Sequence, residues 1–157
     1  DEDSAGFIFM ILICESLAEK VRNTFKEIDL ILSPAIGGIV VGYEIGRILN
    51  IETIFAERAN NLFLLRRGFN IKKGKKILIV EDVITTGKSC IECSELAKKF
   101  GGEILGYACI IDRSSGKSII KNKIISQVQI DIPVFSKEDI PDNLKKIKAV
   151  KPGSRNL

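Results

Sequence analysis

Residues 77–89 constrain the fold of this chain more than any other segment, because a strand pattern there runs directly into a helix pattern. Residues 77–80 are all apolar, which is typical of a strand buried on both faces of a parallel sheet. Glu81 and Asp82 follow at the carboxyl end of that strand, and a helical pattern begins after Gly87. Parallel strands present ligand groups at their carboxyl ends, and a helix start offers free N–H groups to an anion. The segment therefore predicts a sugar-phosphate site, with acids for ring hydroxyls and amides for the phosphate.

The same segment has two other interpretations. In an ordinary strand–turn–helix connection, Thr or Ser before the helix is often only a cap. The run Thr-Thr-Gly-Lys-Ser at residues 85–89 also matches the end of a nucleotide-binding P-loop. That motif requires a glycine five residues before Gly87. Asp82 stands there instead, and its carboxylate would crowd and repel a phosphate, so the P-loop is disfavoured.

Strand and helix patterns alternate along the rest of the chain. We expect helices over residues 15–26, 38–49 and 88–100, and strands over residues 29–32, 52–56, 76–81, 103–111 and 124–130. Residues 57–61 are polar and are expected to form a loop, with residues 63–67 and those around Phe69 pairing as strands at its base. Strands that alternate with helices predict an α/β fold with a mostly parallel central sheet flanked by helices.

Composition is that of one globular domain without a specialised partner surface. A chain of 157 residues fits one core, and its 45% apolar and 28% charged content argues against disorder. The net charge of +4 is mild and the basic residues are scattered, so nucleic-acid binding is not indicated. The apolar run at residues 7–14 is too short to span a membrane and is expected to be a buried strand or the first turns of a core helix.

The cysteine and histidine content limits the metal sites and the acid–base catalysis that this chain could support. Cys90 and Cys93 form one Cys-x-x-Cys pair, but a zinc site needs four ligands, and the chain has no second such pair and no histidine. We therefore expect buried, reduced cysteines and a cytoplasmic location. The absence of histidine also excludes histidine acid–base catalysis.

Residues 77–89 resemble the phosphoribosyl diphosphate (PRPP) signature of type I phosphoribosyltransferases: a short apolar strand, two acids, two variable residues, then Thr-x-Gly-x-[ST]. Other pieces resemble orotate phosphoribosyltransferases of the kind with a short catalytic loop. These pieces are Ser33-Pro34-Ala35-Ile36-Gly37-Gly38, Phe55-Ala56-Glu57-Arg58, Leu65-Arg66-Arg67-Gly68-Phe69, Asp112-Arg113-Ser114 and Lys151-Pro152-Gly153-Ser154-Arg155. The resemblance runs from about Leu30 to Arg155 and implies Mg²⁺-dependent transfer of ribose 5-phosphate from PRPP to orotate, in UMP biosynthesis.

The resemblance also implies roles for the PRPP-binding residues. Glu81 and Asp82 would hold the ribose hydroxyls, with Mg²⁺ bridging those hydroxyls and the pyrophosphate, and with Asp82 the one candidate for a direct metal ligand. PRPP would lie along Glu81, Asp82, Val83, Ile84, Thr85, Thr86, Gly87, Lys88 and Ser89. The pyrophosphate would lie against Ala35, Ile36, Gly37 and Gly38, where small residues leave room for it. Some orotate enzymes carry a lysine in place of Gly37, so one charge contact would be missing here.

The remaining implied roles concern the mobile loop and orotate. Arg58, with Arg66 and Arg67 as further candidates, would act from a loop that closes over the pyrophosphate. In the family this loop reaches the neighbouring subunit, which implies a homodimer with shared active sites. Arg113 and Thr85 would contact orotate, because a guanidinium pairs well with a carboxylate. Residues 1–157 are expected to form one phosphoribosyltransferase domain that lacks part of the amino-terminal segment covering the pyrimidine in the family.

Structural and functional alternatives remain open for these residues. The acids could be solvated groups at a strand end, residues 35–38 a plain turn, Arg66 and Arg67 surface charge, and Arg113 an ordinary strand-end residue. Among functions, the alternatives are a purine or uracil phosphoribosyltransferase, or a regulator that senses PRPP without catalysis. The first would lack the Asp-Arg-Ser and Lys-Pro-Gly-Ser-Arg pieces, and the second would need a nucleic-acid-binding appendage.

Overall fold

The apolar strand segments form one six-stranded sheet in a computed structural model that describes residues 2–133, 135–136, 138–148 and 150. The strand order is β3-β2-β1-β4-β5-β6. The strands are β1 (Leu30–Pro34), β2 (Thr53–Ala59), β3 (Leu62–Leu64), β4 (Lys76–Ile84), β5 (Glu103–Asp112) and β6 (Ile124–Gln129). The helices are α1 (Glu2–Thr24), α2 (Gly37–Leu49), α3 (Lys88–Lys99) and α4 (Asp142–Lys145).

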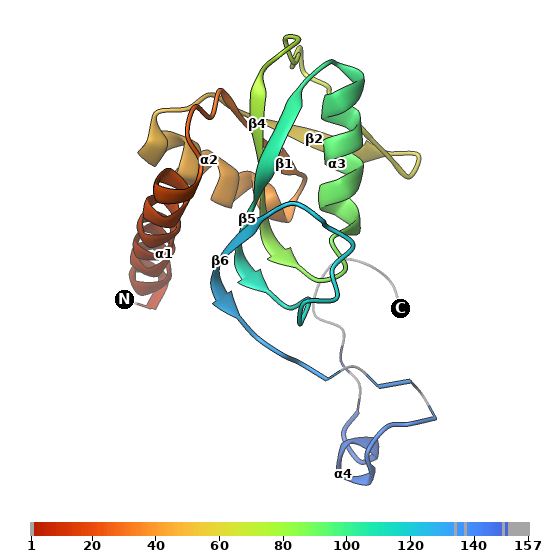
Figure 1. Cartoon of the computed structure of the whole chain (residues 1–157). Helices are drawn as coiled ribbons and strands as arrows, with labels where there is room; N and C mark the ends of the chain where they lie inside the picture. Colours follow the sequence, from red (N-terminus) through yellow and green to blue (C-terminus); the bar gives the residue numbers. More distant parts are fainter. Residues whose placement is uncertain (1, 134, 137, 149, 151–157) are drawn as a thin grey trace.

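The sheet is parallel except at one edge. β1 pairs in parallel with β2 and β4, and β5 pairs in parallel with β4 and β6. β3 pairs antiparallel with β2. The helices α1 and α2 cover one face and α3 covers the other, as Figure 1 shows. This arrangement confirms the predicted α/β fold with a mostly parallel sheet flanked by helices.

Strand β4 is the centre of both halves of the core. Ile77 and Ile79 pack with α3, whereas Leu78 and Val80 pack with α1 and α2. All four side chains are fully buried, because a central parallel strand has helices on both of its faces. The unbroken apolar run therefore predicted this strand correctly, and it sets the position of Glu81 in the carboxyl-terminal half of the strand.

Two segments differ from the sequence prediction. Residues 57–59 belong to β2 rather than to a loop, and β3 pairs with β2, through Arg58 opposite Phe63, rather than with residues around Phe69. The physical reason is the turn at Asn60 and Asn61, whose φ values of 49° and 63° suit a tight hairpin. The polar residues of this segment thus include a two-residue turn and do not form a long loop.

The amino-terminal helix is also longer than predicted. Helix α1 begins at Glu2, so residues 7–14 are helical rather than a strand, but Ile8, Phe9 and Leu12 are more than half exposed and only Cys14 of residues 8–14 is fully buried. The short helix α4 was not predicted at all. Within the described ranges, no helix is both long enough and apolar enough to cross a membrane. The Lys-Pro-Gly-Ser-Arg piece at residues 151–155 lies outside the described residues.

Candidate active site

Glu81 and Asp82 lie in the carboxyl-terminal half of β4, which continues to Ile84 instead of ending at Glu81 as predicted, and both are partly buried. The thiol of Cys90 on α3 donates a hydrogen bond to Glu81 Oε2 over 3.0 Å. Burial raises the pKa of Glu81 above its ordinary value, the bond from Cys90 opposes this rise, the charge of Asp82 adds to it and that of Arg58 opposes it. The carboxylate of Glu81 is thus held from the α3 side, whereas that of Asp82 lies against Gly37 at the start of α2.

The turn between β1 and α2, residues 35–38, meets Asp82. A side-chain carbon added to Gly37 would lie 2.4 Å from Asp82 Oδ2, so only glycine fits against this carboxylate as it is placed. An added carbon at Gly38 would lie 3.0 Å from the carbonyl oxygen of Val80. The helix α2 begins at Gly37, and no side chain caps its first turn. The structure therefore brings together the two turns that the sequence analysis assigned to PRPP.

The turn between β4 and α3, residues 85–87, is built around Gly87, whose φ is 81°. A side-chain carbon there would lie 2.7 Å from Ser118 Oγ and 2.8 Å from Ile120 Cγ1. The carbonyl of Thr86 accepts a 3.0 Å hydrogen bond from the N–H of Ile119. The residues around Ser118 thus support this turn, a role that no sequence motif indicated. Thr85, Thr86 and Lys88 remain exposed at the helix start, where an anion would bind.

Arg58 lies inside β2 and not in a loop. Its guanidinium forms an ion pair with Glu92 on α3 and donates a 2.8 Å hydrogen bond to the carbonyl of Asn61. It also stacks over the ring of Phe63, 4.2 Å from its centroid. No local sequence pattern indicates Glu92 as the partner, because the pairing depends on how α3 packs against the hairpin formed by β2 and β3.

The predicted basic residues and the β1–α2 turn line one pocket of about 640 Å³. Its lining residues are Ala35, Ile36, Gly37, Ile39, Phe55, Glu57, Arg58, Arg66 and Arg67. Glu57 pairs with Arg66 at 3.4 Å and with Arg67 at 2.6 Å, and both guanidinium groups are mostly exposed. Gly37 belongs to this lining and also contacts Asp82, so the pocket adjoins one of the two acids.

Arg113 lies apart from this pocket but at the same edge of the sheet. Its N–H donates a 2.8 Å hydrogen bond to the carbonyl of Ile84, the residue before Thr85. The buried Asp112 shapes this bend by accepting a 2.8 Å hydrogen bond from the N–H of Ser114. The Arg113 side chain is exposed. The backbone contact therefore brings the two residues predicted to contact orotate next to each other.

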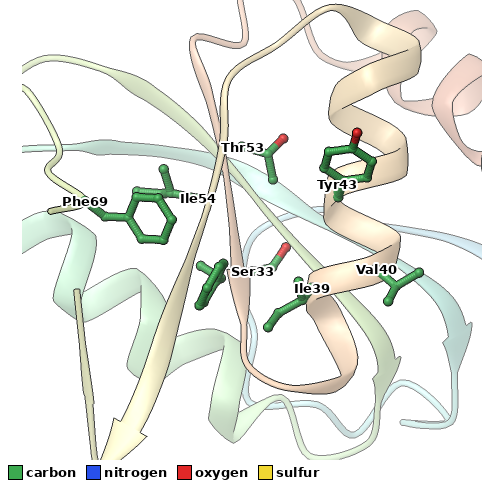
Figure 2. A pocket seen from close by; sticks show the side chains of 8 residues that line it. Ser33, Ile39, Val40, Tyr43, Thr53, Ile54 and Phe69 are labelled. Carbon is green, nitrogen blue, oxygen red and sulfur yellow. The ribbon is translucent and has the colours of Figure 1, made fainter. Parts of the chain in front are cut away.

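A second, apolar pocket of about 330 Å³ lies between α2 and β2. Figure 2 shows its lining side chains, among them Val40 and Tyr43 from α2 and Phe69 from the segment after β3. Val40 and Tyr43 are 60% and 63% exposed. This apolar surface adjoins the basic pocket, because Ile39 and Phe55 line both.

The described residues contain no group of three or more Cys, Asp or Glu side chains that could hold a metal ion on their own. All four cysteines are buried free thiols and none is a disulfide partner.

Comparison with known proteins defines the class of this fold and site. Residues 9–138 match the family described as phosphoribosyl transferase domain. Among solved structures, an adenine phosphoribosyltransferase from Thermoanaerobacter pseudethanolicus superposes with a TM-score of 0.68 at 19% identity, covering 82% of this chain and 83% of that one. An orotate phosphoribosyltransferase from Aeropyrum pernix gives a TM-score of 0.64 at 17% identity, covering 83% and 73%. These similarities confirm the predicted type I phosphoribosyltransferase fold.

Sequence relatives are more specific. An orotate phosphoribosyltransferase from Parvibaculum lavamentivorans is 44% identical over 146 residues, which are 92% of this chain and 75% of that protein. An orotate phosphoribosyltransferase from Methylorubrum populi is 47% identical over 92% of this chain and 74% of that protein. The chain therefore belongs to the phosphoribosyltransferases and, within them, to the orotate phosphoribosyltransferase family.

Proposed function

We propose that this chain transfers ribose 5-phosphate from PRPP to orotate, giving orotidine 5′-monophosphate and pyrophosphate, as a single domain over residues 1–157. The observation that carries the proposal is the contact between the Asp82 carboxylate and the β1–α2 turn at Gly37. It joins an acid pair suited to ribose hydroxyls to a glycine-rich helix start suited to a phosphate. The names of the sequence relatives support orotate as the acceptor.

In this proposal, each segment at the carboxyl edge of the sheet binds one part of PRPP. Glu81 and Asp82 accept hydrogen bonds from the ribose hydroxyls. The 5-phosphate lies in the β4–α3 turn and its flanks, formed by Val83, Ile84, Thr85, Thr86, Gly87, Lys88 and Ser89. The pyrophosphate lies against Ala35, Ile36, Gly37 and Gly38 and faces the guanidinium of Arg58 across the basic pocket.

The residues present fit Mg²⁺ held mainly through substrate. Asp82 is partly exposed, so its carboxylate is accessible to a metal ion and to substrate oxygens. Magnesium retains several waters and substrate oxygens and needs only one or two protein carboxylates. When bound, it neutralises charge on the leaving pyrophosphate. Asp82 is accordingly the one proposed direct ligand.

The proposed chemistry depends on positioning more than on a strong base. The bond from ribose carbon 1 to pyrophosphate breaks and its electron pair leaves with pyrophosphate, while a bond forms from carbon 1 to the ring nitrogen of orotate. The proton on that ring nitrogen passes to the departing pyrophosphate or to water, so the step needs no histidine, which fits a chain that has none. Positive groups such as Arg58 stabilise the departing polyanion in the transition state.

Arg113 and Thr85 bind orotate in this proposal. The guanidinium of Arg113 offers two parallel donors to the orotate carboxylate. In an assay with PRPP and Mg²⁺, the absorbance of orotate falls as it is consumed. Arg113→Ala raises the KM for orotate by about 10- to 100-fold, the scale of a lost charged hydrogen bond, and changes the KM for PRPP much less.

Uracil and adenine are the controls for this assay, because neither carries the carboxylate. Arg113→Ala reduces the preference for orotate over uracil. Consumption of adenine or uracil in place of orotate by the unaltered protein would assign the chain to another acceptor. Binding of PRPP without any transfer would instead indicate a regulator.

We also propose a homodimer with shared active sites. Apolar side chains are exposed on the start of α2 and on the hairpin, with Ile36 85%, Tyr43 63% and Leu62 66% exposed. Ile36 lines the basic pocket and Tyr43 the apolar pocket beside it, and exposed apolar surfaces indicate a protein interface. A second copy covering this surface would bring its own Arg66 and Arg67 towards the site.

The buried free thiols further support a cytoplasmic location, where thiols stay reduced.

Mixing two inactive variants tests the shared site. One variant is Asp82→Asn, and the other carries both Arg66→Ala and Arg67→Ala. Since half of the random dimers are mixed and each mixed dimer has one intact site, a dimer with shared sites recovers about a quarter of the unaltered activity. A fully active monomer in sedimentation at assay concentration would contradict the dimer.

A further inference from the structure

The contact between Cys90 and Glu81 has no place in the proposed function so far. Cys90 lies in the first turn of α3 and is fully buried, and its sulfur is 3.0 Å from Glu81 Oε2. Within the described part of the chain, this thiol is the one side chain that forms a hydrogen bond with Glu81. The other carboxylate oxygen is thus free to accept a hydrogen bond from substrate.

The direction of this hydrogen bond is fixed by the chemistry of the thiol. Burial raises the pKa of Cys90 far above its ordinary value, and the nearby charge of Glu81 raises it further. The thiol therefore stays protonated, and it donates while the carboxylate accepts. Cys93 and Cys109 are also fully buried near Glu81, but neither forms a hydrogen bond with it.

We propose that Cys90 is a positioning residue for PRPP, whose thiol holds the Glu81 carboxylate in the orientation that accepts a ribose hydroxyl. The inference rests on the proposed function, because it takes Glu81 as a ribose ligand. It assigns a role to a residue that does not touch substrate and that the PRPP signature does not include.

The place of Cys90 in the fold gives this contact a second consequence. The β4–α3 turn that binds the 5-phosphate leads directly into the helical turn that carries Cys90. Phosphate binding that fixes the start of α3 therefore also fixes the donor to Glu81. In this proposal the two ends of the ribose 5-phosphate group are coupled through one partly buried hydrogen bond of 3.0 Å.

Three substitutions on α3 test this role. Cys90→Ala removes the donor, Cys90→Ser keeps a donor in the same place, and Cys93→Ala removes a buried thiol one turn further along that does not contact Glu81. The expected result is that Cys90→Ala weakens PRPP binding about tenfold relative to Cys93→Ala, which is the scale of a lost hydrogen bond to a charged group. Cys90→Ser recovers most of the lost affinity for PRPP. Titration calorimetry with PRPP and Mg²⁺ measures binding, and thermal unfolding corrects for general destabilisation.

A double-mutant cycle with Glu81→Gln separates positioning from packing. If Cys90 acts through Glu81, Cys90→Ala has much less effect on PRPP binding in the Glu81→Gln background. An unchanged tenfold loss in that background, or equal losses for Cys90→Ala and Cys93→Ala, would overturn the inference. Calorimetry needs no orotate, so these results stand apart from the orotate assay that tests the proposed function.

Discussion

The β4–α3 segment and the β2–β3 hairpin both contribute to the proposed site, but different forces place their functional groups. Glu81 follows four fully buried apolar residues and is hydrogen-bonded to a buried thiol. Arg58 and Glu57, on the hairpin, are placed by ion pairs with Glu92 and Arg67 whose side chains reach solvent. The first region is therefore positioned by packing and the second by charge.

This difference indicates which part of the site is present before substrate binds. Packed cores resist small displacements, so the acids and the β4–α3 turn form a preorganised half. Exposed ion pairs contribute little stability and are weakened by salt. The hairpin arginines can exchange their carboxylate partners for a pyrophosphate at low cost, which suits residues that close over a leaving group.

The largest expected effect tests the packed region. Gly87→Ala combines an unfavourable φ of 81° with a side-chain carbon 2.7 Å from Ser118 Oγ. We expect a loss of about 3 kcal/mol in the free energy of unfolding, from strain and overpacking together. Gly116→Ala is the matched control, because its φ is 72° but no atom lies within 4 Å. Urea unfolding measures both, and equal losses would mean that the turn is not packed.

The next effect concerns the acid that meets the β1–α2 turn. Asp82→Asn removes one charge and weakens productive PRPP binding by about 1–3 kcal/mol, the scale of a charged hydrogen bond. The measurement is kcat/KM for PRPP in the orotate assay. Glu103→Gln, an exposed acid at the opposite end of the sheet, is the control and leaves kcat/KM unchanged. Unchanged PRPP kinetics in Asp82→Asn would contradict the proposed site.

A smaller effect follows from the burial of Glu81. Its pKa in the folded protein is raised, mainly by burial. As pH rises, the carboxyl of Glu81 therefore loses its proton in the unfolded chain before it does so in the folded protein. The contribution of Glu81 to the free energy of unfolding is fully present below the ordinary pKa of Glu. This contribution is lost as pH rises through the pKa of Glu81 in the folded protein. Glu81→Gln removes this loss and raises the free energy of unfolding at pH 7 by about 1 kcal/mol or less, since solvent screens part of the charge.

The comparison of two pH values checks this prediction. Urea unfolding at pH 7 and near pH 4 gives a gain for Glu81→Gln that shrinks at the lower pH. A gain of the same size at both values would assign it to packing rather than to ionisation. The variant is expected to bind PRPP more weakly, but still measurably, at the same time, as a proposed ribose ligand that costs stability should.

The smallest effect belongs to the hairpin. Arg67→Ala breaks the pair with Glu57 and lowers the free energy of unfolding by about 0.5 kcal/mol or less, because the guanidinium is 66% exposed. Thermal unfolding in low and high salt measures it, and the difference from the unaltered protein disappears in high salt. A loss of several kcal/mol that salt does not change would show that the hairpin is packed like β4–α3.

The sequence predicted the packed region better than the charged one, and the reason is local. The apolar run at residues 77–80 and the glycine at position 87 carry their own structural consequences, so β4, α3 and the turn between them were predicted correctly. The meeting of Gly37 with Asp82 also follows from sequence, because parallel strands bring their carboxyl ends to one edge.

The features that the sequence did not predict depend mostly on contacts between residues distant in sequence. The pair of Arg58 with Glu92 needs α3 to lie against the hairpin, and no local pattern encodes that orientation. The sequence predicts a loop in place of the hairpin because residues 57–61 are mostly polar, whereas the left-handed φ values of Asn60 and Asn61 define a tight turn. The hydrogen bond from Cys90 to Glu81 was missed because burial alone explained the cysteine.

The central place of β4 also has a consequence for biosynthesis. β1 is bordered by β2 and β4, and β4 is bordered by β1 and β5, so the last neighbour of β1 leaves the ribosome well after β1 itself. Until then β1 exposes an unpaired edge, which is a surface for aggregation. The β1–α2 turn and Asp82 meet only when β4 inserts, so the nascent chain acquires the proposed substrate-binding edge in one late step of folding rather than gradually.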